Sequence, residues 1–310
     1  MNKFFKISAV LLLMMNTVNA SAQDNTDDGS APADDKSKKG FHVGMFVGSY
    51  FANKYTASVY DGYGFDFDGN RNGFYESFMY TKIWRQYGGY DYSSQPDQIA
   101  AALSTGSQTV DYHTWTFDES NMPTNMRYTP AFEFGLLGRY TADKKNAILL
   151  NLNAVKLNIN GNFTIILPQQ ANATQVNSRI QTFAIRGGEQ RLLFQVGYQH
   201  LFGESETFNF LLEGGLNVTL AKFDKNEILI NNLRIDLLSN YFQAGYPATI
   251  IKRPIGWGFG AFGGMGLNIA MNPKCTVQLI YSPTYENIRI VQNPRLKMQN
   301  AVGLRAYYSF

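Results

Sequence analysis

The sequence predicts an all-β protein: a closed antiparallel up-and-down β-barrel of eight strands that crosses a membrane. The first observation is that apolar residues recur at every second position in successive stretches, as in strands with one apolar face. The second is that the connections between these stretches alternate between long and short, as they do in membrane barrels. The third is the last stretch, residues 297–310, which alternates up to Phe310. Pairing of this stretch with the first strand would close the sheet and remove its exposed edges.

The first 22 residues have the composition of a secretory signal peptide. Lys3 and Lys6 lie in a short positive region, and residues 7–15 form an apolar run. Residues 20–22 then offer the small side chains that a signal cleavage site needs. We therefore expect residues 1–22 to be cleaved as the chain is exported.

Residues 23–40 contain no large apolar side chain, so we expect a disordered periplasmic linker. The barrel is then expected to span residues 41–310, with one large extracellular loop at about 53–130. The formal net charge of +3 falls to +1 once the two lysines of the signal are removed, and this balance gives no indication of a nucleic-acid partner. Cys275 is the only cysteine, which excludes an internal disulfide.

The alternating stretches are expected to form eight strands. Seven lie at about 41–51, 132–140, 147–159, 208–220, 256–269, 275–283 and 297–310, and the fourth follows a loop at about 160–180 and ends with residues 191–198. In the third strand the alternation switches near Asn153, which predicts a bulge or a misread register. An even number of strands places both chain ends on the same side, here the periplasm. Ten strands are the alternative if the first loop contributes a further pair. A soluble sandwich is another alternative, but in that fold long loops would not be expected at one end and short loops at the other.

With its C-terminal signature and its alternating loop lengths, the chain resembles the eight-stranded outer-membrane barrels typified by OmpX and the OmpA membrane domain. It resembles more closely the PorT-like barrel family of Bacteroidota-type envelopes. The resemblance covers residues 41–310. It implies a location in the outer membrane of a Gram-negative bacterium, with both termini periplasmic and with outer-membrane lipid and lipopolysaccharide as partners. The long first loop exceeds what the simplest members carry, which argues against a bare anchor.

The expected inward faces of the strands carry charged side chains, which must be paired inside a narrow barrel. These residues are Glu133, Arg139, Arg191, Glu213 and Arg305. We expect a polar plug in which the two glutamates accept hydrogen bonds from the three arginines, and an ion path is the alternative. The sixth strand has one face made almost entirely of glycine, which predicts that a bulky group lies against it.

The first loop is rich in aromatic residues, because 10 Tyr, 5 Phe and 2 Trp lie between positions 53 and 130. Disordered segments lack aromatic residues, so the loop is expected to be folded. Residues 94–106 and 233–242 predict helices, and residues 110–117 predict a strand. The aromatic side chains form either an external platform for a protein or glycan partner, or the core of the loop itself. The candidates for binding are Tyr55, Tyr60, Tyr63, Tyr75, Tyr80, Trp84, Tyr87, Tyr90 and Trp115.

One stretch of the first loop has part of the pattern of a calcium loop. Asp68, Asn70 and Asn72 place oxygen-bearing side chains at alternate positions before a glycine, and Glu76 follows. The twelfth position holds Met79 where a bidentate glutamate would be needed. We therefore expect a turn at this place and predict no metal site.

No catalytic site is expected. A lipid hydrolase or acyltransferase would need a histidine beside a serine on the outer side. His113 is the one histidine expected there, among Asp111, Thr114 and Asp118, with Ser104 and Ser107 upstream, and nothing fixes these residues into a triad.

No cofactor motif is present. The sequence predicts a non-enzymatic outer-membrane barrel that presents its aromatic loop for binding or complex formation. The alternatives are a subunit of an envelope secretion or assembly machine, an envelope-lipid-modifying enzyme and a small pore.

Overall fold

The structure is a computed structural model that describes residues 40–66, 68–84, 94–104, 110–111, 114–167, 180–205, 207–238, 255–290 and 295–309. The predicted signal peptide and the predicted linker up to residue 39 lie outside the described residues, as do Tyr87, Tyr90, His113 and Phe310. Among the described residues, no helix combines the length and the apolar character that crossing a membrane requires.

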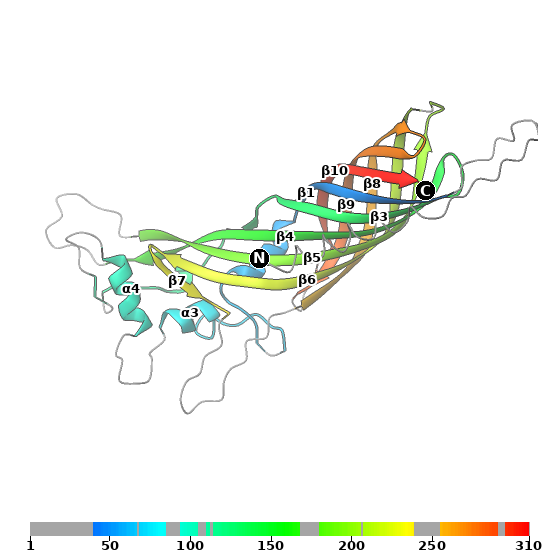
Figure 1. The fold of residues 1–310 in the computed structure, drawn as a ribbon. Helices are drawn as coiled ribbons and strands as arrows, with labels where there is room; N and C mark the ends of the chain where they lie inside the picture. The colour runs from blue at the N-terminus through cyan, green and yellow to red at the C-terminus, as the bar shows by residue number, and fades with distance from the viewer. Residues whose placement is uncertain are drawn as a thin grey trace, which may run out of the picture. The chain divides into compact units, whose positions relative to one another are not determined.

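Eight antiparallel strands form a closed ring. They are β1 (Gly40–Phe51), β3 (Ala131–Thr141), β4 (Asn146–Ile166), β5 (Ile180–Phe202), β6 (Phe208–Ile230), β8 (Ile255–Asn272), β9 (Cys275–Arg289) and β10 (Lys297–Ser309). Each strand pairs with its neighbours in chain order, and β1 pairs with β10 from His42–Ser309 to Phe51–Asn300. The closed eight-stranded fold that the sequence predicts is therefore confirmed (Figure 1).

Short connections join β3 to β4, β5 to β6 and β8 to β9 at the end of the barrel where β1 begins, which we call the turn end. The longer connections lie at the opposite end, which we call the loop end (Figure 1). Two further strands are short and lie at the loop end. Strand β2 (Arg127–Tyr128) pairs with β4, and β7 (Leu233–Asp236) pairs with β6.

Large apolar side chains cover the outside of the barrel. Exposed members of this apolar belt occur on all eight strands of the ring, and they include Val43, Met45, Val47, Phe134, Leu150, Phe194, Val196, Leu212, Leu216, Phe259, Met265, Leu279, Val302 and Leu304. A belt of this extent cannot face water in a soluble monomer. A closed sheet leaves no unpaired edge in hydrocarbon, so the chain forms a transmembrane β-barrel.

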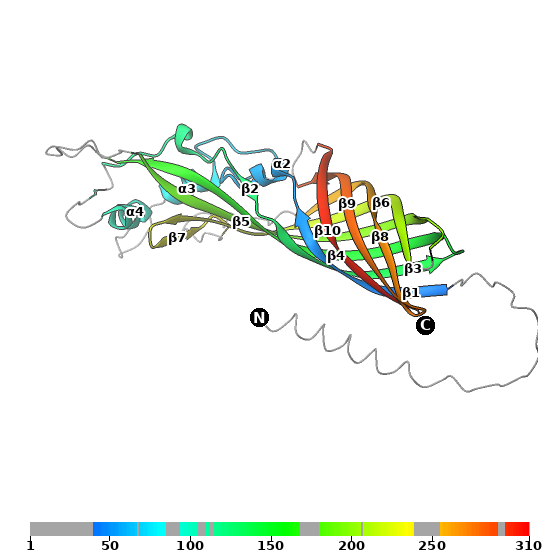
Figure 2. The same ribbon diagram turned by 90° about the horizontal axis from the view of Figure 1, so that it is seen from above.

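Strands β4, β5 and β6 are 21, 23 and 23 residues long, against 12 for β1 and 11 for β3. These three strands are much longer than the sequence predicts. Figure 2 shows that they continue past the ring as a curved sheet at the loop end. The described part of residues 53–128 packs against this extension, and we call the extension and these residues together the module.

The predicted bulge near Asn153 is wrong. The pairing of β4 with β5 runs without a register shift from Asn146–His200 to Ile166–Ile180. Odd-numbered residues of β4 point inward along its whole length, from Leu149 through Asn153 to Phe163. What changes beyond this point is the chemistry of the two faces, because the strand leaves the apolar belt and enters the module.

The first loop contains short helices: α2 (Lys54–Ala57), α3 (Phe78–Ile83) and α4 (Gln95–Leu103), with the 3₁₀ turns η1 (Ser58–Tyr60) and η2 (Glu119–Asn121). Helix α4 confirms the helix predicted after Ser94, whose side chain forms a capping box with Asp97. The strand predicted over residues 110–117 is wrong, because its described part makes only an isolated bridge from Thr116 to Ile166.

The helix predicted over residues 233–242 is wrong at its start, where the chain forms β7. The alternation of Leu233 and Ile235 with charged residues suits a strand that returns along β6. Asn231 makes this reversal with φ of 50°, a conformation that asparagine tolerates better than most residues. The remainder of the predicted helix, residues 239–242, lies outside the described part of the chain.

The glycine face of β8 points into the barrel, where other groups approach it closely. A Cβ at Gly264 would lie 2.6 Å from the Cγ atom of Glu213. A Cβ at Gly260 would lie 2.1 Å from the carbonyl oxygen of Tyr285 on the next strand. The bulky groups predicted against this face are therefore a buried glutamate and the backbone of β9.

Candidate functional site

An ion pair crosses the middle of the barrel from β6 to β10. The guanidinium of Arg305 donates to both carboxylate oxygens of Glu213, with N–O distances of 2.6 and 2.8 Å. Both side chains are buried, with 3% and 5% of their residues' surface exposed. Gln199 on β5 also donates to Glu213 at 3.2 Å and exchanges hydrogen bonds with Gln278 on β9. Side chains from four strands thus meet across the lumen.

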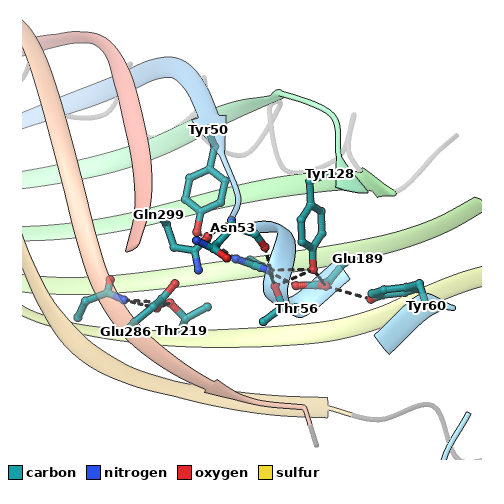
Figure 3. A network of polar contacts seen from close by, with 11 residues as sticks. Tyr50, Asn53, Thr56, Tyr60, Tyr128, Glu189, Thr219, Glu286 and Gln299 are labelled. Atoms are coloured by element: carbon teal, nitrogen blue, oxygen red, sulfur yellow. Dashed lines mark hydrogen bonds and ion pairs between the residues drawn. The ribbon is translucent and has the colours of Figure 1, made fainter. Parts of the chain in front are cut away.

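Arg191 lies where the barrel joins the module and is the centre of a second network. Figure 3 shows its partners Tyr50, Thr56, Tyr128 and Glu189. Its Nε atom donates to the Glu189 carboxylate at 2.5 Å, and its terminal nitrogens donate to three hydroxyl groups. These hydroxyls belong to Tyr50 of β1 at 3.2 Å, Thr56 of α2 at 3.2 Å and Tyr128 of β2 at 3.1 Å. One buried cation therefore ties three segments to β5.

Glu189 completes this network from the same face of β5. Its Oε2 atom accepts from Tyr60 at 3.0 Å and from Tyr128 at 2.7 Å. We expected Arg191 to pair with Glu133 or Glu213. That prediction is wrong, because Arg191 pairs instead with Glu189, which is only two positions away on the same strand face. Sequence reasoning missed Glu189 because it assigned faces only to the last residues of the fourth strand, 191–198. We call the Arg191, Glu189, Tyr50, Thr56, Tyr60 and Tyr128 side chains the junction network.

Glu133 and Arg139 do not pair with each other. Glu133 accepts from the Asn153 amide at 2.9 Å, and the guanidinium of Arg139 lies 4.5 Å from the ring centre of Tyr307. A small cavity with room for about one water molecule adjoins Glu133, Asn153 and Arg305. The five charged residues expected inside the barrel are all buried, but within the described residues Glu213–Arg305 is the one expected ion pair that forms.

Glu286 is a further buried carboxylate that sequence reasoning missed. It accepts from Thr219 at 2.5 Å and from the Asn217 amide at 2.7 Å, both on β6 (Figure 3). The signal that could have found it is the continued alternation of β9 beyond residue 283, which places Ser282, Thr284 and Glu286 on one inward face.

Several predicted binding aromatics form the core of the module. Tyr60 has no exposed surface and stacks on Phe223 with ring centres 4.1 Å apart. Trp115 is buried and stacks on Trp84 at 4.7 Å with an interplanar angle of 14°. Tyr63 is buried beneath the Arg71 guanidinium, which lies 3.5 Å from its ring centre. These side chains hold the module together and cannot contact a partner directly.

Other predicted aromatics reach the surface. Tyr75 is 68% exposed and packs edge-on against Phe74 and Tyr80, with ring centres 5.2 Å apart in both cases. Phe74 and Tyr80 are themselves 4.9 Å apart and partly buried. We call these three residues the aromatic triad. Tyr55 is half-buried at the rim of the barrel, away from the triad.

The module also contains a buried carboxylate outside the membrane-spanning strands. Asp61 accepts from the backbone N–H of Tyr63 at 3.0 Å and from Arg71 at 2.6 Å. Burial raises the pKa of Asp61 above its ordinary value, and these hydrogen bonds offset only part of that shift. Burial and the nearby Glu189 carboxylate likewise raise the pKa of the Tyr60 phenol, which therefore stays protonated and donates.

The residues with the partial calcium pattern form a turn that is closed by a bridge between Phe65 and Arg71. The Asp66 carboxylate accepts from the Asn70 backbone at 2.7 Å and from the Asn70 amide at 3.1 Å. The Asn72 amide donates to the Tyr63 carbonyl at 3.1 Å. Asp68 and Glu76 lie in the same region. In the described part of the chain, no three His, Cys, Asp or Glu side chains come together as metal ligands.

The residues considered for catalysis are not brought together where the structure describes them. Ser104 donates to the Ala100 carbonyl at 2.9 Å and accepts from the Val110 N–H at 2.9 Å. Thr114 donates to the Asp111 carbonyl at 2.7 Å, and Asp118 caps η2. These hydroxyls and carboxylates end helices and close turns.

No protein-family model matches the sequence, and no curated protein matches it. Among solved structures, the chain is similar to Neisserial surface protein A, with 9% identity, a TM-score of 0.37, and coverage of 87% of this chain and 97% of that one. It is similar to Ail, the attachment invasion locus protein of Yersinia pestis, with 10% identity, a TM-score of 0.33, and coverage of 88% and 99%. It is also similar to the outer membrane protein OprG from Pseudomonas aeruginosa, with 11% identity, a TM-score of 0.37, and coverage of 88% and 97%.

A further solved structure holds Ail in complex with the heparin analogue sucrose octasulfate. The assignment of this chain as a transmembrane barrel rests on its own closed ladder and its own apolar belt.

Proposed function

We propose that this protein is a non-enzymatic outer-membrane barrel that presents a rigid module at the cell surface for binding or complex formation. The observation that carries the proposal is the junction network. It fixes the first loop to the barrel through a fully buried Arg191–Glu189 pair and three tyrosine hydroxyls. A loop that only connected two strands would not need such an attachment.

The interior of the barrel supports presentation over transport. Side chains meet across the lumen at Glu213–Arg305 and at Gln199–Gln278, and the junction network lies over the loop end. Buried ion pairs of this kind block the path that water and ions would take. If the barrel were a small pore, it would show open-channel steps in planar bilayers. The proposed plug should show none.

The aromatic triad is the part of the module that best suits contact with a partner. Exposed tyrosine offers a large, rigid, amphipathic side chain at a low entropic cost. Tyr75 is held by two other rings, so its position is set before a partner binds. A protein or a glycan partner fits this chemistry.

The test places a photo-crosslinking amino acid at Tyr75 in intact cells, with Tyr140 on the barrel wall as the matched control position. Presentation predicts a crosslinked partner at Tyr75 that is absent at Tyr140, and loss of that partner in Tyr80→Ala. A partner captured equally at Tyr140 would favour a subunit of a secretion or assembly machine that binds through its wall. A lipid-modifying activity of the purified chain that is lost in Ser104→Ala would favour the enzyme.

A further inference from the structure

The sheet that β4, β5, β6 and β7 form in the module has one face that points away from the module core. Ile185 of β5 pairs in register with Ile228 of β6, and both side chains are fully buried in that core. The neighbouring row of Asn160, Arg186 and Glu227 points to the opposite side, because side chains alternate along each strand. We call this opposite side the polar face.

The polar face carries more basic than acidic side chains. Its acidic members are Asp224, Glu227 and Asp236. Its basic members are Arg127, Lys156, Arg186, Lys222, Lys225 and Arg234. Lys225 and Arg234 share the Glu227 carboxylate, and Lys156 lies 3.8 Å from Asp224. Positive charge is therefore in excess on this face.

Arg127 and Arg186 carry part of this excess at the centre of the polar face. Both are exposed, and within the described part of the chain neither makes an ion pair or a side-chain hydrogen bond. They are the register partners of Asn160 on its two sides, from β2 and from β5. Neighbouring strands lie about 4.8 Å apart, so arginine, asparagine and arginine follow one another across the face at that spacing.

The amides of β4 add uncharged hydrogen-bonding groups to the polar face. Asn158 and Asn162 lie on either side of Asn160 along the strand, and both are exposed. Among the described residues, the side chains of these three asparagines make no hydrogen bond. A free amide both donates and accepts, which suits the hydroxyl groups of a sugar.

The side chains that anchor a protein partner are missing from the described part of the polar face. Protein interfaces have a core of aromatic and large apolar side chains. No aromatic residue lies on the described part of this face, and Ala184 and Leu229, the apolar residues beside the arginine row, are half-buried. Ile166 and Ile180 lie at the far end of the strands. The chemistry therefore favours a polar, acidic ligand.

We propose that the polar face binds an acidic polysaccharide whose sugar units carry carboxylate groups. The guanidinium groups of Arg127 and Arg186 match carboxylates with two parallel hydrogen bonds each, and the amide of Asn160 between them bonds to hydroxyl groups. The inference rests on the proposed function, because that function places the module outside the cell. The site is separate from the aromatic triad, since Phe74 and Tyr80 pack against the module core on the other side of the sheet.

The experiment measures the binding of oligogalacturonate to the folded full chain in micelles by titration calorimetry. The test variant carries Arg127→Gln and Arg186→Gln, and the matched control carries Lys144→Gln and Lys145→Gln at the turn end. The test variant should bind about 30-fold more weakly, because it loses two charge-assisted contacts, and the control should bind as the wild type does. Asn160→Ala should bind about 3-fold more weakly.

Two further ligands test the class of the partner. Neutral dextran should not bind, and polyaspartate of equal charge should bind the wild type about 10-fold more weakly than oligogalacturonate does, because it offers no hydroxyl groups to the amides. Equal affinity for polyaspartate would overturn the proposal in favour of an acidic protein. Equal binding of oligogalacturonate by the wild type and the test variant would also overturn it.

A single substitution keeps the proposal testable if the double change prevents folding. A folded barrel changes its migration on a gel when it is boiled. If the test variant lacks this change, Arg186→Gln alone should still bind oligogalacturonate about 5-fold more weakly than the wild type. Unchanged binding by this folded single variant would contradict the role of the arginine row.

The outcome separates this inference from the proposed function. Crosslinking at Tyr75 does not involve the polar face, so the test variant should keep its crosslinked partner. Loss of oligogalacturonate binding with that partner retained supports the inference. Retained oligogalacturonate binding in the test variant overturns the inference alone, and absence of a partner at Tyr75 in both chains overturns presentation by the triad alone.

Discussion

Strand β4 has opposite chemistry in the barrel and in the module. In the barrel, β4 points Ile148 and Leu150 outward and Asn151 and Asn153 inward. In the module, the same outward face carries polar residues such as Asn162, while the inward face carries Ile159, Phe163 and Ile165.

The inversion occurs between Ala154 and Lys156, and no bulge in β4 is needed to produce it. The outward face of this one continuous strand meets hydrocarbon in the barrel and water in the module. In β4 the boundary is therefore a change of polarity on both faces at constant register, whereas the pairing of β5 with β6 shifts its register at Gly188 and Glu189.

The largest effect should come from breaking the junction network that joins the two regions. Arg191→Met leaves Glu189 buried without its cation, which should cost about 3–5 kcal/mol. Unfolding in denaturant, followed by the fluorescence of Trp84 and Trp115, measures the loss. Adding Glu189→Leu should restore most of the stability, because both charges are then gone. A stability of Arg191→Met equal to that of the wild type would show that the junction network does not hold the module.

A charge on the outer face of β4 should have different effects on the two sides of the boundary. Leu150→Lys places an ammonium in the apolar belt and should cost about 2–4 kcal/mol. Asn162→Lys makes a similar change on the same face within the module and should cost less than about 0.5 kcal/mol. Urea unfolding of both variants in lipid vesicles measures the difference. Equal costs would contradict the boundary.

Removal of one phenol oxygen should also separate the two regions. Tyr60→Phe deletes a buried hydrogen bond to the Glu189 carboxylate and should cost about 1.5–3 kcal/mol. Tyr140→Phe on the barrel wall removes an exposed hydroxyl and should cost less than about 0.5 kcal/mol. The same unfolding assay measures both. A smaller loss for Tyr60→Phe than for Tyr140→Phe would exclude Tyr60 from the junction network.

The smallest effect should be the pH dependence of two aspartates. Hydrogen bonds from Asn146 and from the N–H of Lys145 lower the pKa of Asp143 in the exposed β3–β4 turn. A lowered folded-state pKa adds stability above the unfolded value, about 3.9. That stability is lost as the pH falls through the folded pKa. The raised pKa of Asp61 acts in the opposite direction, because its ionised form is disfavoured when folded. Its unfavourable contribution is therefore relieved as the pH falls.

Stability profiles between pH 3 and pH 7 check both signs. Relative to Asp143→Asn, the wild type should have a higher free energy of unfolding near pH 7, and this difference should disappear at low pH. Relative to Asp61→Asn, the free energy of unfolding of the wild type should increase as the pH falls. The same direction for both residues would contradict the assigned environments.

The barrel could be predicted from the sequence because period two and sorted loop lengths are local signals. The module could be predicted only as a folded, aromatic loop. Tyr60 and Tyr75 are indistinguishable in sequence, and their exposure is decided by β6 residues such as Phe223 that lie far away in the chain. Glu189 and Glu286 were missed because the strands that carry them continue beyond the apolar belt, where the faces that guided the prediction change their chemistry.

The most direct test of the membrane boundary is a pair of single cysteines on β4. Leu150→Cys and Asn162→Cys, each with Cys275→Ser, are labelled with an environment-sensitive fluorophore in lipid vesicles. The label at 150 should be quenched by brominated lipid and protected from iodide, and the label at 162 should show the reverse. Quenching of both labels by the same agent would contradict a barrel whose long strands leave the membrane to build the module.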